Sequence, residues 1–98
     1  MDASKKGWQG FVDLCLGAEN VDTLEAMFDL FLTPEEKVDI ARRFLIVREL
    51  IKAEKTQRDI AKSLDVSIAK ITRGSNEIKR LEKKWVQYLS EAIEKPKP

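Results

Sequence analysis

The side chains in this sequence that are most able to do chemistry are its arginines and lysines, because the usual catalytic and metal-binding residues are scarce. The chain of 98 residues has no His and a single cysteine, Cys15. One Cys without His cannot build the common zinc sites or an internal disulfide. No Ser or Asp has a recognisable activating partner for nucleophilic or acid–base catalysis. We therefore expect neither an enzyme nor a bound metal or cofactor.

The basic residues are concentrated in the middle of the chain. The net charge is only +1, but residues 1–41 carry three Lys or Arg against nine Asp or Glu, a net charge of −6. Residues 42–84 carry thirteen against six, a net charge of +7. A basic segment in an otherwise acidic chain favours a face that binds phosphates, which supply most non-specific DNA affinity. The alternative is a charge-mixed helical surface that is simply solvated.

The spacing of apolar residues predicts helices almost throughout. Trp8, Phe11, Val12 and Cys15 follow the i, i+3, i+4, i+7 pattern of a helix with one apolar face. Thr33-Pro34-Glu35-Glu36 has the residues of a capping box, and Thr56-Gln57-Arg58-Asp59 repeats that logic. The predicted helices cover about 7–16, 21–31, 34–53, 57–63, 68–80 and 82–93. No strand pattern or internal repeat is expected.

Length and composition predict a single soluble domain over residues 1–98. The chain is 43% hydrophobic and 36% charged, with few Gly and Pro, as in globular proteins. No apolar stretch is long enough for a signal peptide or a membrane span, so we expect a cytoplasmic protein with no membrane partner. A frayed tail at 94–98 follows from Lys95-Pro96-Lys97-Pro98.

Two short helices joined by a tight turn between residues 56 and 80 predict a helix-turn-helix unit. In such units the second helix enters the major groove and presents its N-terminal residues to base edges. Ile60 and Leu64 would face inward, and Ala61 stands where close helix packing needs a small side chain. The alternative is an ordinary helical hairpin packed into a bundle.

Particular residues of this unit resemble one family closely. Thr56-Gln57-Arg58 is followed by Ile68-Ala69-Lys70 and then by the run ITRGSN, from Ile71 to Asn76. Together with Leu32-Thr33-Pro34, these landmarks resemble the Trp repressor family in order and spacing, over about Trp8 to Leu89. The run ITRGSN is much more specific than a generic helix-turn-helix pattern.

The resemblance implies an all-α fold, a six-helix intertwined homodimer with a helix-turn-helix DNA-reading unit. The first, second, third and sixth helices would form a shared core. The last predicted helix is consistent with this shared core, because it has an apolar stripe too wide for one small chain to cover. The stripe consists of Trp85, Val86, Leu89 and Ile93. A twofold dimer would match a palindromic operator in double-stranded DNA.

The resemblance also implies L-tryptophan as corepressor, with its indole held between Arg43 and Arg73. Guanidinium planes stack on an indole with about 0.5–2 kcal/mol each, and Arg73 could also pair with the ligand carboxylate. The ligand ammonium would bind backbone carbonyls of the other subunit. The implied binding residues are Leu30, Leu32, Thr33, Arg43, Ile46, Arg73, Gly74 and Glu77, with Gly74 leaving room for the ligand. Without the resemblance, both arginines would be interpreted as solvated helix charges.

For DNA, we expect Arg58 to contact a guanine directly, because its fork can bond both O6 and N7. Contact with phosphate alone is the alternative. Ile68 and Ala69 present a small apolar helix tip for close approach to the groove. Phosphates or water-bridged bases would be reached by Lys70, Thr72 and Lys79, and Ser67 is a further expected DNA-binding residue. Bound tryptophan would favour the orientation in which both units of the dimer fit successive major grooves.

Several residues depart from familiar members of the family. Lys70 stands in place of a common threonine, and Ala61 and Leu45 replace basic residues, so operator preference can differ. Glu77 replaces a serine beside the ligand, where a carboxylate could pair with the ligand ammonium or with Arg73, or could simply face solvent. Two other functions stay open: a regulator of the same fold that senses another indole or amino acid, and a helical protein-interaction adaptor.

Overall fold

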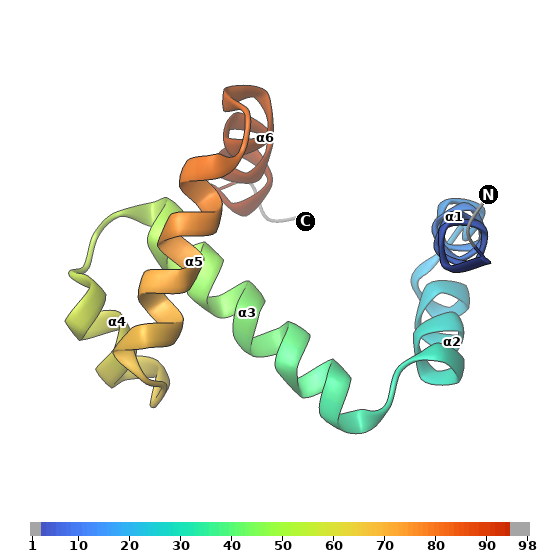
Figure 1. Ribbon diagram of the computed structural model, residues 1–98, viewed down its shortest axis with the longest axis horizontal. Coiled ribbons are helices and arrows are strands. Elements are labelled where there is room, and N and C mark those ends of the chain that lie inside the picture. Colours follow the sequence, from blue (N-terminus) through green and yellow to red (C-terminus); the bar gives the residue numbers. More distant parts are fainter. Residues whose placement is uncertain (1–2, 95–98) are drawn as a thin grey trace. The chain divides into compact units, whose positions relative to one another are not determined.

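The computed structural model describes residues 3–94, and in that range the chain is all-helical, as the sequence predicts. Its six helices are shown in chain order in Figure 1. They are α1 (Ala3–Leu16), α2 (Val21–Phe31), α3 (Pro34–Lys52), α4 (Gln57–Leu64), α5 (Ile68–Arg80) and α6 (Lys83–Glu94). The chain divides into two compact units, one up to Lys37 and one from Val38 onward, with the division inside α3.

The predicted helix ends are nearly right, and the differences have local causes. α1 begins at Ala3 and not near residue 7. Apolar periodicity detects only the patterned part of a helix, and the polar residues that precede this part include no helix-breaking residue. α3 ends at Lys52, since Ala53 has the left-handed φ of 56°. Glu94, which we assigned to the tail, is the last residue of α6. Pro96 disfavours helix chiefly at the residue before it, so the helix can include Glu94. Residues 95–98 of the predicted tail lie outside the described residues.

In the first unit, α1 and α2 are joined by aromatic contacts. The rings of Phe11 and Phe31 meet edge to face with centroids 5.4 Å apart, and Trp8 lies 5.7 Å from Phe11. Neither helix has a fully buried residue. Large apolar side chains remain open to solvent, with Leu16 78% and Leu30 72% exposed. In the predicted stripe of α1, Trp8 is 67% exposed whereas Phe11, Val12 and Cys15 are half-buried, so this stripe is only partly covered within one chain.

The second unit contains the hydrophobic core of the described residues. Ile46 of α3, Ile60 and Ala61 of α4, and Ile71 of α5 are the buried residues, with Ile60 and Ile71 almost fully enclosed. Leu50, Leu64 and Val66 pack around them. The inward orientation predicted for Ile60 and Leu64 is confirmed. The core thus holds α4 and α5 against the C-terminal part of α3.

The last helix keeps an open apolar face. Trp85 is 49% and Tyr88 63% exposed, whereas Val86, Leu89 and Ile93 are half-buried. Lys84 places its ammonium 4.9 Å from the centroid of the Trp85 ring, a cation–π contact at the surface. In the described part of the chain no helix is both long and apolar enough to cross a membrane.

Candidate nucleic-acid interface and ligand site

Hydrogen-bonded caps at both ends of α4 define the helix that precedes the turn into α5. The hydroxyl of Thr56 accepts a hydrogen bond from the N–H of Asp59 at 3.1 Å, which fixes the start of α4. At its other end, Asp65 adopts the left-handed conformation with φ 54° and donates its N–H to Lys62 O, while Val66 N–H donates to Ala61 O at 3.0 Å. These two bonds form the Schellman pattern of a helix C-terminus. Only three residues, 65–67, therefore separate the end of α4 from the start of α5.

Ser67 then begins the second helix of the unit. Its hydroxyl oxygen accepts a hydrogen bond from the N–H of Lys70 at 3.3 Å, so the side chain we expected on DNA also caps α5. The hydroxyl proton is not used by this cap and can still be donated. Ala61 is 9% exposed between the helices, where a small side chain permits close packing. Residues 56–80, called here the helix-turn-helix unit, therefore have two capped helices, a tight turn and a shared core.

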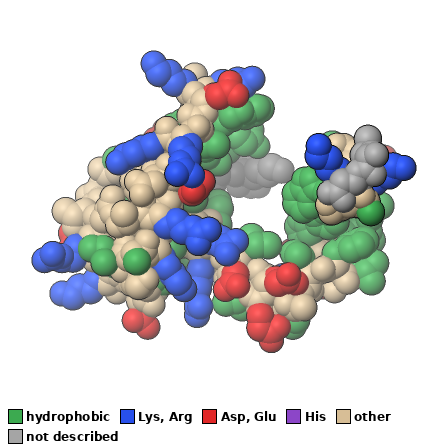
Figure 2. Space-filling model, in the orientation of Figure 1, with side chains coloured by type: hydrophobic (Ala, Val, Ile, Leu, Met, Phe, Trp, Pro, Cys, Tyr) green, Lys and Arg blue, Asp and Glu red, His purple; other side chains and the backbone are tan. Residues whose placement is uncertain are grey.

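The residues expected to contact DNA are accessible on this unit. Ile68 is 48% exposed at the start of α5, and the other predicted contacts, Arg58, Ser67, Ala69, Lys70, Thr72 and Lys79, are exposed too. Figure 2 shows Lys and Arg side chains spread over the part of the second unit that includes α4 and α5. The segment that carries the excess positive charge in the sequence thus has an accessible basic surface.

One polar contact joins α4 and α5 and involves a residue that sequence reasoning missed. The hydroxyl of Thr72 donates a hydrogen bond to Oε1 of Gln57 at 3.0 Å, between residues 15 positions apart. Gln57 belongs to the motif that carries the family resemblance, but its amide has no partner at helical spacing. Only the packing of the two helices reveals the pair.

The residues of the expected ligand site in the second unit lie on α3 and α5. Ile46 is buried at 5% exposure, Gly74 is half-buried, and Arg43 and Arg73 are exposed. A Cβ added to Gly74 would lie 3.1 Å from Cγ2 of Ile46 and 3.4 Å from Cδ1 of Leu50. The space beside Gly74 is therefore filled by two side chains of α3, so this glycine allows close helix packing. Its contact with a ligand stays a prediction.

Glu77 has a partner different from either of the two that we considered. Its Oε1 lies 3.3 Å from Nη1 of Arg80, three residues further along α5, and both side chains are largely exposed. An exposed pair of this kind contributes at most about 1 kcal/mol. Glu77 can therefore exchange Arg80 for another cation at little cost.

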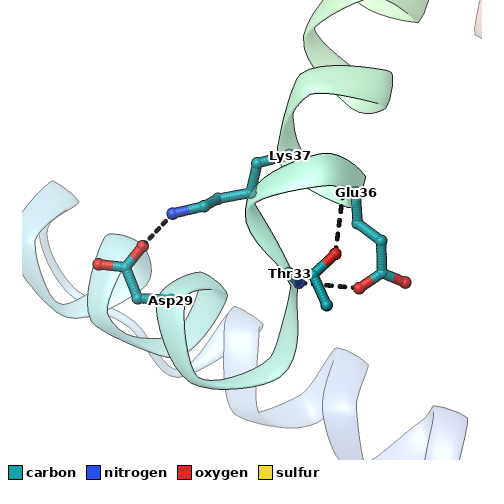
Figure 3. A network of polar contacts seen from close by, with 4 residues as sticks. All are labelled: Asp29, Thr33, Glu36 and Lys37. Carbon is teal, nitrogen blue, oxygen red and sulfur yellow. Dashed lines mark hydrogen bonds and ion pairs between the residues drawn. The ribbon is translucent and has the colours of Figure 1, made fainter.

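The remaining predicted ligand residues, Leu30, Leu32 and Thr33, lie where α2 ends and α3 begins. Thr33 and Glu36 form a reciprocal capping box, in which Thr33 N–H donates to Oε1 of Glu36 at 2.8 Å and Glu36 N–H donates to the Thr33 hydroxyl at 3.1 Å (Figure 3). Asp29 and Lys37 form an ion pair across the same turn. The sequence predicted this capping box, and it is confirmed.

The turn has a consequence for the backbone carbonyls of Leu30 and Leu32. A continuing helix would supply the N–H of residue 34 to Leu30, but Pro34 has none. The N–H of Glu36, which would reach Leu32, donates to Thr33 instead. Both carbonyls therefore lack their helical donors, at the negative end of the α2 dipole.

A charged cluster closes the connection from α3 to α4. The carboxylate of Glu49, 13% exposed, lies 3.2 Å from Nζ of Lys55 and 3.7 Å from Nε of Arg48. The hydrogen bond with Lys55 is the main reason that the pKa of Glu49 is lowered from its ordinary value of 4.5, with smaller contributions from the charges of Lys55, Lys52 and Arg48. The described residues contain no group of three His, Cys, Asp or Glu placed to hold a metal ion.

Fold and geometry together define a small all-helical protein with a helix-turn-helix unit, a class that includes many DNA-binding regulators. Comparison with known families is specific: the profile of the family "Trp repressor protein" matches residues 6–93. The chain belongs to the Trp repressor family, and the resemblance found in the sequence is confirmed. The family consists of DNA-binding regulators, so the prediction that the chain is not an enzyme is also confirmed.

Curated relatives agree over most of the chain. A "Trp operon repressor homolog" of Chlamydia trachomatis serovar D is 43% identical over 89 residues, which cover 91% of this chain and 95% of the relative. The homolog of Chlamydia caviae is 41% identical, over 90% of this chain and 87% of the relative. That of Vibrio campbellii is 40% identical over 76% of this chain and 74% of the relative. The chain is therefore a transcriptional regulator of the Trp repressor type.

Proposed function

We propose that the chain is a homodimeric repressor that binds a palindromic operator of tryptophan metabolism or uptake genes when L-tryptophan is bound as corepressor. The observation that carries the proposal is the capped, accessible helix-turn-helix unit in a chain of this family. We further propose that it acts in the cytoplasm, with no membrane partner.

Incomplete burial supports the homodimer. Four residues form the buried core of the described chain, whereas Trp8, Leu30, Phe44 and Tyr88 are all at least half exposed. Monomeric proteins rarely leave so much apolar surface open. A second copy of the chain would cover the open faces of α1, α2 and α6 through a twofold interface. The two helix-turn-helix units of such a dimer, one from each chain, would reach successive major grooves about 34–36 Å apart. This spacing is known for this class of protein, Trp repressor itself included.

Two carbonyls without helical donors support a site for the ligand ammonium. Those of Leu30 and Leu32 lack helical donors beside the hydroxyl of Thr33, and ammonium groups supply three donors. In the family arrangement these carbonyls face the partner chain's Arg43, Ile46, Arg73 and Gly74. The two guanidinium groups would enclose the indole, and Arg73 would pair with the carboxylate. A ligand that joins both chains in this way favours one orientation of the helix-turn-helix units.

For DNA recognition, we propose that Arg58 forms a bidentate contact with guanine while Ile68 and Ala69 approach the groove closely. Ser67, Lys70, Thr72 and Lys79 would lie near phosphates or water-bridged bases. Binding should therefore be salt-sensitive, which a protein-interaction adaptor would not explain.

The test is fluorescence anisotropy of the purified protein with a palindromic tryptophan-operator duplex, with and without L-tryptophan, at two salt concentrations. We expect salt-sensitive binding that tightens with tryptophan and loses this response in Arg73→Ala. Salt-sensitive binding without the response would support the second candidate, a regulator that senses another indole or amino acid. Absence of salt-sensitive binding would refute both.

Glu77 is the residue that most directly tests ligand choice. Its weak pair with Arg80 leaves the carboxylate available to a ligand ammonium or to Arg73. We expect Glu77→Ser to change tryptophan affinity in calorimetry. An unchanged affinity would remove Glu77 from the ligand site.

A further inference from the structure

Glu77 has two cations at helical spacing on α5, and it pairs with only one of them. Residues three or four positions apart are neighbours on a helix surface. For Glu77 the cations at these positions are Arg73 and Arg80. Nη1 of Arg80 donates a hydrogen bond to Oε1 of Glu77 at 3.3 Å. Among the described residues, Arg73 takes part in no ion pair. The carboxylate of Glu77 is therefore held by Arg80 and not by Arg73.

The order of the charges along α5 explains this choice of partner. A glutamate that precedes its cation along a helix forms a more stable pair than one that follows it, consistent with the helix dipole. Glu77 precedes Arg80 but follows Arg73. Arg80 is also the last residue of α5, where the negative end of the dipole favours a cation. Both effects favour the pair with Arg80 over a pair with Arg73.

The choice of partner matters for the carboxylate of a ligand. A guanidinium group that is bound to a carboxylate of the protein must release it before the same N–H donors can bind a second carboxylate. Of the residues three or four positions from Arg73, only Glu77 is acidic. Glu77 is thus the nearest competitor along α5 for the guanidinium that we place on the ligand. Its pair with Arg80 holds this competitor away.

We infer that Arg80 is a positioning residue for the proposed ligand site, because by holding Glu77 it keeps the guanidinium of Arg73 open to the carboxylate of L-tryptophan. The inference rests on the proposed function, which assigns Arg73 to the ligand. The side chains of Arg80 and Glu77 are 77% and 61% exposed, so their pair is weak. An exposed pair shifts an equilibrium by up to about fivefold. The effect on ligand affinity should be of the same size, because affinity falls with the fraction of protein that is competent to bind.

Calorimetric titration of L-tryptophan into the full-length protein, without DNA, tests the inference. Arg80→Ala releases Glu77, which can then pair with Arg73, so we expect tryptophan to bind about two- to fivefold more weakly at low salt. Arg80→Lys keeps a cation at this position and should restore most of the affinity. Salt at about 1 M screens exposed charges strongly. The loss of affinity in Arg80→Ala should therefore shrink at high salt, and a loss of the same size at both salt concentrations would overturn the inference.

A double-mutant cycle separates action through Glu77 from a direct effect of the Arg80 charge on the ligand. In Glu77→Gln no carboxylate at this position can occupy Arg73, so adding Arg80→Ala should change affinity by less than about twofold. A loss that persists in this background would mean that Arg80 attracts the ligand directly. Tighter binding in Arg80→Ala alone would mean that the released carboxylate binds the ligand ammonium. Unchanged binding would mean that Glu77 does not reach Arg73. Each of these three results overturns the inference.

A matched control removes a cation from another exposed glutamate. Nζ of Lys84 lies 3.9 Å from Oε2 of Glu82, and both side chains are largely exposed. Neither residue is within four positions of Arg73. Lys84→Ala should therefore bind tryptophan as the wild type does, and a loss equal to that of Arg80→Ala would mean that only net charge matters, against the inference. Melting curves by circular dichroism should confirm that every variant is folded.

Two further measurements distinguish failure of this inference from failure of the proposed function. In the free protein, the Nε–H NMR signal of Arg73 should move in Arg80→Ala, but not when Arg80→Ala is added to Glu77→Gln. An unmoved signal in Arg80→Ala overturns the positioning role. If the wild type does not bind L-tryptophan, the proposed function fails and this inference with it. If binding is lost in Arg73→Ala but is the same in Arg80→Ala, only this inference fails.

Discussion

Gly74→Ala provides the sharpest test of how α5 is seated on α3. The added methyl group would lie 3.1 Å from Cγ2 of Ile46 and 3.4 Å from Cδ1 of Leu50. The distance to Ile46 is shorter than an ordinary van der Waals contact. Ile46 is 5% exposed and cannot easily move aside. Gly10→Ala is a matched control, because Gly10 also lies inside a helix and a Cβ there meets nothing within 4 Å.

The expected magnitudes follow from two opposing effects. Replacing Gly by Ala in a helix interior stabilises by about 0.8–1 kcal/mol at either position. Overpacking of a filled core costs about 1–3 kcal/mol, and only Gly74→Ala incurs this cost. The propensity gain cancels between the two variants, so Gly74→Ala should be less stable than Gly10→Ala by about 1–3 kcal/mol.

Urea unfolding followed by circular dichroism would measure this difference. Protein concentration must be the same in every experiment, because the proposed dimer would make stability depend on it. We expect Gly10→Ala to raise the midpoint and Gly74→Ala to leave it unchanged or lower it, with equal slopes. Equal stabilisation by both substitutions would refute the tight approach of α5 to α3.

Three further substitutions test local features of the chain. Ala53→Gly should stabilise by up to about 1 kcal/mol in urea unfolding, because φ is 56° at this position; a lower midpoint would contradict the left-handed geometry. Thr33→Ala should destabilise by about 1 kcal/mol through loss of the capping box with Glu36, whereas Thr33→Ser should retain most of the stability and would contradict the capping role if it did not. The pKa of Glu49 is lowered in the folded state by Lys55. The contribution of this carboxylate to folding stability is therefore present above the ordinary pKa of 4.5 and is lost as pH falls through the lower pKa of the folded state. Glu49→Gln should therefore have a lower melting temperature than the wild type at pH 7, and its melting temperature should fall less on acidification. Identical pH profiles of the melting temperature would exclude a stabilising role of the Glu49 carboxylate.

Much of the fold could be predicted from local patterns because the elements are governed by nearby residues. The caps at Thr33 and Thr56 each involve residues three positions apart, a spacing that the sequence displays directly. The start of α1 was predicted too late, because its first residues lack the apolar periodicity that the prediction used. The site prediction depended on family-specific residues such as the run from Ile71 to Asn76, since Arg43 and Arg73 alone look like ordinary surface charges.

The sequence by itself determined the helices, their caps, the basic middle segment and membership of the Trp repressor family, because these depend on residue types at short, fixed spacings. The tertiary structure alone decided which partners distant residues take. It paired Thr72 with Gln57 and filled the space beside Gly74 with Ile46 and Leu50. The physical reason is that helix packing brings together residues from separate elements, and side-chain rotamers select among neighbours. Neither choice is encoded in a spacing along the chain.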